Sequence, residues 1–257
     1  MKKTTIVSKT KIELNNPVIV EGLPGLGIVG KIATRYLIRN LKARKLAELY
    51  SPHFPYYVHV NKKGDIRLLR GDFYFWKNPS EETDLILLIG DSQAQTIEGQ
   101  YEVADCILDF AEKTGSKKII TLGGYRKEAE AAPKVVAVSG NQKLLNDALQ
   151  AGAVPSSAGT PIVGTAGLIL GLAKFRNIDA LCLLAETRGY LPDPRAAKSI
   201  LIVLQKLLNV EVDLSGLEKE IEKSEGIVEK MAEIEKRRER DTQKMRRMEE
   251  ERITYIS

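Results

Sequence analysis

The sequence contains little cysteine and little histidine, and this restricts the chemistry it can support. There are 2 Cys and 2 His among 257 residues. Cys106 and Cys182 are far apart and lie among apolar residues, so we expect two small core residues and no disulfide or metal pair. His53 and His59 alternate with aromatic residues and have no neighbouring Cys. We therefore predict no metal site and no cofactor.

The sequence also lacks a long hydrophobic run. No segment approaches the roughly 18 continuous apolar residues that a membrane-spanning helix requires. The first five residues, Met1–Thr5, lack the apolar centre of a secretion signal. These features predict a cytoplasmic protein without a membrane partner.

A basic stripe is absent as well, although the net charge is +5. The segment Glu218–Arg252 holds 11 basic and 12 acidic residues, so the positive charge belongs to the rest of the chain. It is spread there over short clusters such as Lys2–Lys3 and Lys117–Lys118, without interleaved aromatic platforms. We therefore expect no nucleic-acid partner.

Apolar segments of two periodicities dominate the first 209 residues, and the apolar share of 43% suffices for a full core. Short runs rich in branched aliphatic residues predict buried strands, and longer amphipathic segments between them predict helices. This alternation indicates an α/β fold with three layers and a mostly parallel central sheet. The strands are expected at 18–20, 84–90, 118–122, 135–138 and 178–185, and the helices at 26–40, 97–113, 141–150, 166–175 and 194–208.

Shorter strands are expected between residues 46 and 75, with Asn61–Asp65 as a hairpin turn. The aromatic residues Phe73, Phe75 and Trp76 allow two interpretations. They could stack on nucleic-acid bases, or they could belong to a half-buried hairpin at a subunit contact. We favour the subunit contact.

A glycine-rich segment follows the first buried strand. Gly25, Gly27 and Gly30 match G-x-G-x-x-G, and Gly25–Lys31 also matches G-x-x-x-x-G-K, so two phosphate-binding patterns overlap. Both matches are imperfect, because Ile32 stands where a magnesium-binding hydroxyl is needed.

Two functions therefore remain open for this segment. A nucleotide-binding enzyme would use the Gly25–Lys31 loop, with Glu48 as the acid that binds a ribose. Alternatively, the glycines permit a tight turn and close packing of a helix on the sheet. We favour the structural role, in which Gly22 and Pro24 belong to the same motif.

No catalytic constellation emerges elsewhere in the sequence. Glu186 and Asp193 are seven residues apart, but no histidine base, metal triad or activated nucleophile lies beside them. The serines lack the G-x-S-x-G pattern of a nucleophile elbow. We therefore predict that the protein is not an enzyme.

The composition changes after Asn209. Residues 1–209 form the predicted α/β domain, and residues 210–252, rich in Glu, Lys and Arg, are expected to form a charged helical arm. Residues 253–257 form an apolar tip with a carboxylate end, which favours a docking peptide made by Ile253, Tyr255, Ile256 and Ser257. The alternative for the arm is a polar tail without a role, and the alternative for the tip is a fraying hydrophobic end.

Four motifs in order resemble the proteasome assembly chaperone family in its archaeal branch, across roughly residues 10–209. They are Gly22–Gly30, Gly90–Gln93, Thr121–Tyr125 and Glu186–Tyr190 with Pro192–Pro194. The long charged extension is similar to that of the homologue B type within this branch. The resemblance implies a phosphorylase-like α/β fold, no enzymatic activity and a homo-oligomer, expected as a tetramer.

The resemblance also implies a partner, the α-ring of the proteasome. Tails of this family that dock on the ring carry a hydrophobic residue, then tyrosine, then one final residue. Tyr255 is third from the end here, so Ile253 and Tyr255 would act after a shift of one residue. Several arms on one homo-oligomer would raise the effective concentration of each docking event.

Overall fold

The computed structural model describes residues 1–80, 82–127, 132–224 and 226. Its strands are β1 (Thr5–Ser8), β2 (Val18–Gly22), β3 (Arg44–Tyr50), β4 (Val58–Val60), β5 (Ile66–Leu68), β6 (Gly71–Trp76), β7 (Leu85–Gly90), β8 (Lys118–Arg126), β9 (Val135–Ser139), β10 (Val154–Pro155) and β11 (Asp179–Thr187). Its helices are α1 (Val29–Asn40), α2 (Ile97–Lys113), α3 (Gln142–Gln150), α4 (Thr165–Leu172) and α5 (Pro194–Leu208), with single 3₁₀ turns at Leu26–Ile28 and Ala173–Phe175.

One mixed sheet organises these elements. Its strand order is β1-β3-β6-β7-β2-β8-β11-β9-β10, and a separate hairpin is formed by β4 and β5. The four central strands β7, β2, β8 and β11 are parallel. Antiparallel pairs flank this centre on both sides, between β6 and β7 and between β11 and β9. The predicted α/β class is confirmed, and besides the four central strands the edge pair β9 and β10 is also parallel.

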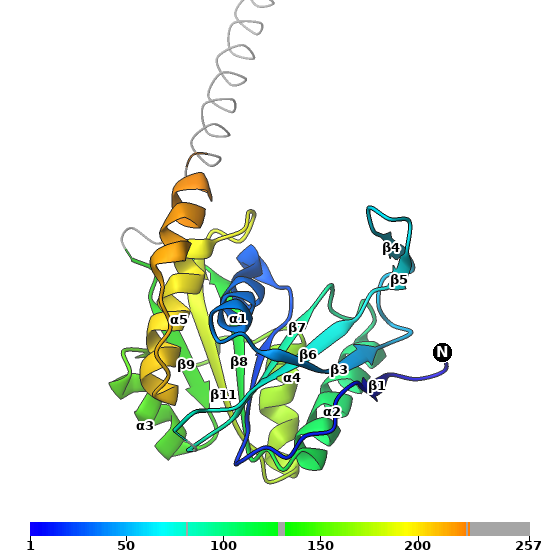
Figure 1. The fold of residues 1–257 in the computed structure, drawn as a ribbon. Helices are drawn as coiled ribbons and strands as arrows, with labels where there is room; N and C mark the ends of the chain where they lie inside the picture. The colour runs from blue at the N-terminus through cyan, green and yellow to red at the C-terminus, as the bar shows by residue number, and fades with distance from the viewer. Residues whose placement is uncertain (81, 128–131, 225, 227–257) are drawn as a thin grey trace, which may run out of the picture. The chain divides into compact units, whose positions relative to one another are not determined.

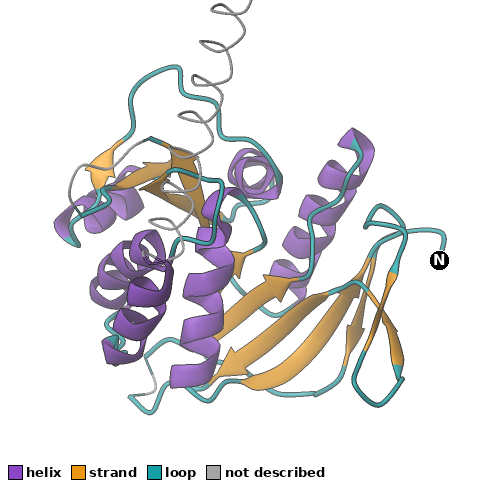
Figure 2. Ribbon diagram, turned by 90° about the horizontal axis from the view of Figure 1, so that it is seen from above, coloured by secondary structure: helices purple, strands orange, loops and turns teal. Residues whose placement is uncertain are grey.

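Helices cover both faces of the sheet (Figures 1 and 2). Helices α2 and α4 pack together on one face, while α1 and α5 pack together on the other. Residues alternate between the two faces along each strand, so the buried strands supply apolar side chains to both helix layers. The predicted three-layer arrangement is therefore confirmed.

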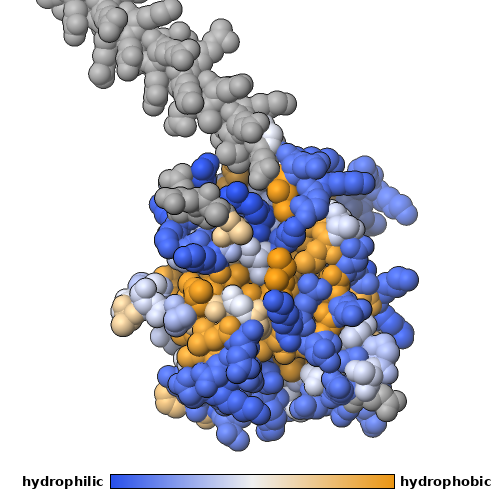
Figure 3. Space-filling model, turned by 90° about the vertical axis from the view of Figure 1, so that its left-hand side faces the viewer, coloured by the Kyte–Doolittle hydropathy of each residue, from blue (hydrophilic) through white to orange (hydrophobic). Residues whose placement is uncertain are grey.

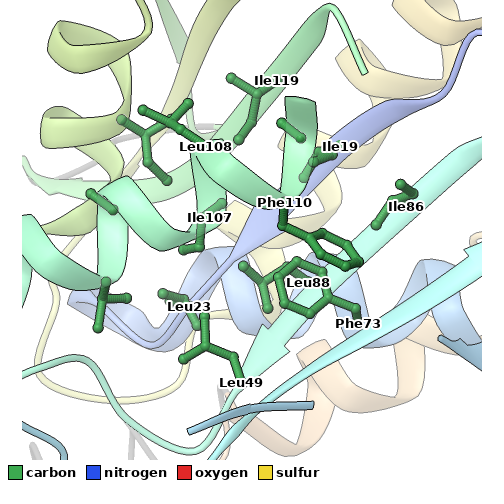
Figure 4. Packing of buried hydrophobic residues seen from close by; sticks show 14 of the residues in the cluster. Ile19, Leu23, Leu49, Phe73, Ile86, Leu88, Ile107, Leu108, Phe110 and Ile119 are labelled. Atoms are coloured by element: carbon green, nitrogen blue, oxygen red, sulfur yellow. The ribbon is translucent and has the colours of Figure 1, made fainter. Parts of the chain in front are cut away.

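A large apolar cluster fills the space between the sheet and helix α2 (Figure 4). Phe73 of β6 and Phe110 of α2 lie with ring centroids 4.4 Å apart at its centre. Phe73 is completely buried and Phe75 is 4% exposed. Neither ring is therefore available to stack on a base or to form a subunit contact, and for these two residues both interpretations from the sequence are wrong. The two rings are core residues.

Side-chain caps set the first turns of three helices. Thr96 accepts a hydrogen bond from the Gly99 amide at the start of α2, and Asn141 accepts one from the Leu144 amide at the start of α3. Asp193 caps α5, whose first residue is Pro194. Such caps satisfy amides that have no partner within the helix. The predicted starts of these helices are therefore borne out within a residue.

The structure divides into two compact units, Met1–Leu214 and Ser215–Ser257. In the second unit, residues 215–224 are helical, and most of the predicted arm lies outside the described residues. The predicted docking residues 253–257 also lie outside them. Within the described part of the chain, no helix is both long and apolar enough to cross a membrane.

Candidate functional site

The motifs that stood out in the sequence meet at one edge of the sheet. Strands β2, β7, β8 and β11 run parallel, so the segments that follow them lie together at their carboxyl ends. In open α/β sheets this edge is the common place for ligands and partners. The contacts of each segment therefore decide what the edge can bind.

Glycines at this edge let helix α1 approach the sheet closely. A β-carbon on Gly30 would lie 2.2 Å from the carbonyl oxygen of Leu122 in β8. A β-carbon on Gly22 would lie 2.3 Å from the carbonyl oxygen of Gly30. Real β-carbons do not come so near to a backbone oxygen, so neither position accepts a side chain without a backbone shift. Gly22 and Gly30 thus form a direct contact between helix and sheet.

The turn at Gly27 is joined to the segment that follows β11. Gly27 has a φ of 60°, a conformation that glycine adopts readily. Its amide donates to the Gly189 carbonyl (3.3 Å), and its carbonyl accepts from the Asp193 amide (2.9 Å). The Asp193 carboxylate accepts from the Thr187 hydroxyl (2.8 Å) and from the Ala196 amide (2.9 Å). The backbone polar groups of Gly27 are therefore used within the protein.

Gln93, after β7, occupies the space beside Pro24 and Gly25. Its Nε2 donates to the Pro24 carbonyl (2.6 Å), and its Oε1 accepts from the Thr165 amide (3.2 Å). The Thr165 hydroxyl donates to Gln100 Oε1 of α2 (2.7 Å). One glutamine thus connects the glycine-rich loop to the start of α4. The sequence marks Gln93 as polar at a strand end, but nothing in it indicates Thr165 or Gln100 as its partners.

A buried carboxylate lies near the end of β11. Glu186 at the end of β11 accepts from Tyr125 (3.0 Å), from Lys127 Nζ (2.8 Å) and from the Lys134 amide (3.0 Å). Burial favours the neutral carboxyl, but these three donors outweigh burial and lower the pKa of Glu186. Burial and the bond to Glu186 raise the pKa of Tyr125 to about 12. Glu186 is thus held ionised by its three donors, and the Asp193 carboxylate caps helix α5.

Glu21 is the buried acid without an ionic partner at this edge. In the register of the sheet, Glu21 of β2 is paired with Thr121 of β8, and Thr121 is paired with Cys182 of β11. Its Oε1 accepts from the Leu23 amide (2.8 Å), and its Oε2 has no hydrogen-bond partner in the described part of the chain. Burial raises the pKa of Glu21 to about 7, although the Leu23 bond opposes this. Glu21 therefore gains or loses its proton near neutral pH.

The residues expected for a nucleotide site lie apart or are held by other contacts. Glu48 belongs to β3, and β6 and β7 separate it from the glycine-rich loop. Its carboxylate is bound by Lys9 Nζ (2.9 Å) and Arg70 Nη1 (2.8 Å). Ile32 is 8% exposed and belongs to the core. No group of three or more potential metal ligands occurs among the residues that the structure describes.

A separate groove lies beside α5. It has a volume of about 330 Å³ and is lined by the segment before β9, by β9 and β10 and by α5, with Pro133, Val154, Ile202 and Lys206 among the lining residues. Figure 3 shows this side of the molecule, where apolar side chains gather across the middle of the face and hydrophilic side chains lie mostly around them. The groove contains no residue of the four motifs and no cluster of catalytic groups.

Comparison with known proteins gives one consistent result. Residues 19–232 match the PAC2 family. An uncharacterized protein of Methanocaldococcus jannaschii is 35% identical over 224 residues, covering 86% of this chain and 85% of the relative. These matches confirm the family resemblance expected from the sequence motifs.

Two solved structures extend the likeness to the fold. Pyrococcus furiosus PbaB, described as an archaeal proteasome activator, is 39% identical with a TM-score of 0.85, over 90% of this chain and 100% of PbaB. Pyrococcus furiosus PbaA, described as an archaeal homolog of proteasome-assembly chaperone, is 28% identical with a TM-score of 0.75, over 95% of this chain and 98% of PbaA.

Proposed function

The chain belongs to the PAC2 family, and from this membership we propose that it is a non-enzymatic chaperone or activator that binds the α-ring of the proteasome. The observation that carries the proposal is the similarity to PbaB, which extends over nearly the whole of both chains. PbaB is itself described as a proteasome activator. A shared fold over that length, at this identity, supports a shared partner more strongly than a short motif does.

The contacts at the carboxyl edge of the sheet support the same proposal. Gly27 bonds to the segment after β11, and Gln93 bonds to Pro24 and Thr165. These groups hold the protein's own loops together, which is the behaviour of a structural platform. In this proposal Gly22, Pro24, Gly25, Gly27 and Gly30 serve the fold, and no cofactor takes part.

The contact with the ring is assigned to the end of the chain. Ile253, Tyr255 and Ile256 form the apolar tip, and the carboxylate of Ser257 can meet a lysine or backbone donors. The protein acts as a homo-oligomer, which we take to be a tetramer. Several tails then reach one ring, so that individually modest contacts give useful avidity.

A pull-down tests this function. Purified α-rings are incubated with the full-length protein or with a variant that lacks residues 253–257, and the native mass of each protein is measured in parallel. The full-length protein is expected to retain the rings, while the truncated protein keeps its own mass and loses them. Equal retention of rings by both proteins would refute the role of the tail.

A further inference from the structure

The hairpin formed by β4 and β5 has one face that is entirely aliphatic. Its register pairs Val58 with Leu68 and Val60 with Ile66, so these four side chains lie on the same face. Their exposed fractions are 43%, 53%, 63% and 70% for Val58, Leu68, Val60 and Ile66. The apolar face of the hairpin is therefore open to solvent.

The opposite face is polar and is attached to the body of the protein. Between the two apolar pairs the register pairs His59 with Arg67. Arg67 donates from both terminal nitrogens to the carboxylate of Asp91, with 3.0 Å between Nη2 and Oδ1. Asp91 follows β7 and also accepts from the Arg70 amide (3.0 Å). The bidentate ion pair between Arg67 and Asp91 thus fixes the polar face of the hairpin against the protein, and the aliphatic face points outward.

This arrangement is the reverse of an ordinary surface hairpin, whose apolar face covers the core and whose polar face meets water. In Figure 1 the hairpin stands away from the sheet and its helices. The adjoining Tyr56 is fully exposed and Tyr57 is 56% exposed. Tyr57 packs edge-on against His59 and so lies on the polar side of the hairpin. The four aliphatic side chains and Tyr56 together leave on the order of 600 Å² open, a large part of the roughly 800 Å² that one partner covers in a standard protein interface.

We propose that the aliphatic face of the β4–β5 hairpin docks against the same face of a second copy of this chain. The inference rests on the homo-oligomer in the proposed function and identifies one surface that forms it. A face without charged side chains needs no charged counterpart, and under a two-fold axis an aliphatic face complements itself. Two such β-layers pack about 10 Å apart with their side chains interdigitated.

Charge substitution on this face tests the pairing in the full-length protein. One variant carries Val60→Glu with Ile66→Glu, and a second carries Val60→Lys with Ile66→Lys. All four side chains are exposed within a single copy, so the fold should tolerate either change. The matched control is Val163→Lys, which changes a side chain that is 86% exposed and lies outside the hairpin. Native mass and circular dichroism are measured for each protein.

Each charged variant is expected to form a smaller species than the wild type, while the Val163→Lys protein keeps the wild-type mass. An equimolar mixture of the glutamate and lysine variants is expected to recover the larger species at low salt, because opposite charges then face each other. A monomeric wild type, unchanged mass in both variants, or no recovery in the mixture would overturn the proposal.

The result of the hairpin experiment can be distinguished from the result of the tail truncation. Loss of ring binding with wild-type mass in the hairpin variants would assign this face to the ring and overturn the pairing of two copies. Removal of residues 253–257 leaves the hairpin unchanged. A truncated protein that still binds rings would therefore contradict the proposed tail mechanism without affecting the mass expected for the hairpin variants.

Discussion

Gly30 of helix α1 lies directly against Leu122 of strand β8, so close that a β-carbon on Gly30 would stand 2.2 Å from the Leu122 carbonyl oxygen. The same turn of α1 also lies against Gly22 of β2. Two segments of the glycine-rich motif thus meet where the helix rests on the sheet. The close contacts account for Gly22 and Gly30, and the φ of 60° accounts for Gly27, whereas a β-carbon on Gly25 would meet only Gln93 Nε2.

Replacement of Gly30 should destabilise the protein. Alanine would gain about 1 kcal/mol in helix propensity, but overpacking typically costs about 1–3 kcal/mol, and a backbone carbonyl at 2.2 Å puts this site at the upper end of that range. A net loss of up to roughly 2 kcal/mol is therefore expected for Gly30→Ala. Urea unfolding of the variant and the wild type measures the difference. Gly25→Ala is the control, since a β-carbon there meets only Gln93 Nε2, at 3.8 Å. Equal losses in the two variants would show that the close contact is not the cause.

Asp193 should stabilise both the start of α5 and the loop around Gly27. Its carboxylate accepts from the Ala196 amide and the Thr187 hydroxyl. Loss of a capping side chain costs about 1–2 kcal/mol, so Asp193→Ala should lower the urea midpoint. Asp193→Asn retains an acceptor oxygen and should lose much less. Indistinguishable midpoints for the two variants would contradict a capping role.

Glu21 should make the protein less stable as the pH rises. Burial raises its pKa in the folded state from 4.5 to about 7. The folded state therefore holds the proton more tightly than the unfolded state. The stabilisation by this proton is fully present below pH 4.5 and is lost as the pH rises through 7, with a total of about 3 kcal/mol.

The Glu21→Gln variant isolates this effect. Its amide oxygen can still accept from the Leu23 amide, and the side chain does not ionise. The difference in unfolding free energy between wild type and variant, measured between pH 4 and 8.5, should move by about 3 kcal/mol in favour of the variant. Groups common to both proteins cancel in this difference. A constant difference across the range would show that folding does not raise the pKa of Glu21.

Tyr255 should dominate the contribution of each tail to ring binding. A buried aromatic anchor commonly contributes more than 2 kcal/mol, so Tyr255→Ala should weaken the binding of one tail at least about 30-fold, and avidity should enlarge the effect. Thr254→Ala is the neighbouring control and should bind nearly as the wild type. Surface plasmon resonance on immobilised α-rings gives both affinities. Similar affinities for the two variants would show that Tyr255 is not the anchor residue of the tail.

The sequence predicts elements well where local patterns determine them. The run Asp84–Gly90 is too apolar for a half-exposed strand, and it forms the central strand β7. Pro194 after Asp193 predicts the start of α5, which begins there. Where tertiary contacts determine the end of an element, the sequence predicts it less well. The sequence predicts a strand that ends at residue 122, but β8 continues to Arg126, because it stays paired with β11 up to Thr187.

The same holds for the functional features, because local patterns can be predicted and long-range contacts cannot. The polar ends of the strands are visible in the sequence, but the bond from Gln93 to Pro24 joins residues 69 positions apart and has no local signal. The alternation of Val58, His59 and Val60 predicts a strand with two unlike faces. It cannot tell which face meets the protein, because that depends on the ion pair between Arg67 and Asp91.

Sedimentation velocity of purified α-rings mixed with the full-length protein measures directly whether the protein binds the ring. Binding of the ring predicts a new boundary that sediments faster than either component, at a protein concentration near the apparent dissociation constant. The boundary should vanish for the protein that lacks residues 253–257. If the rings and the full-length protein sediment independently at every ratio, the protein does not bind the ring.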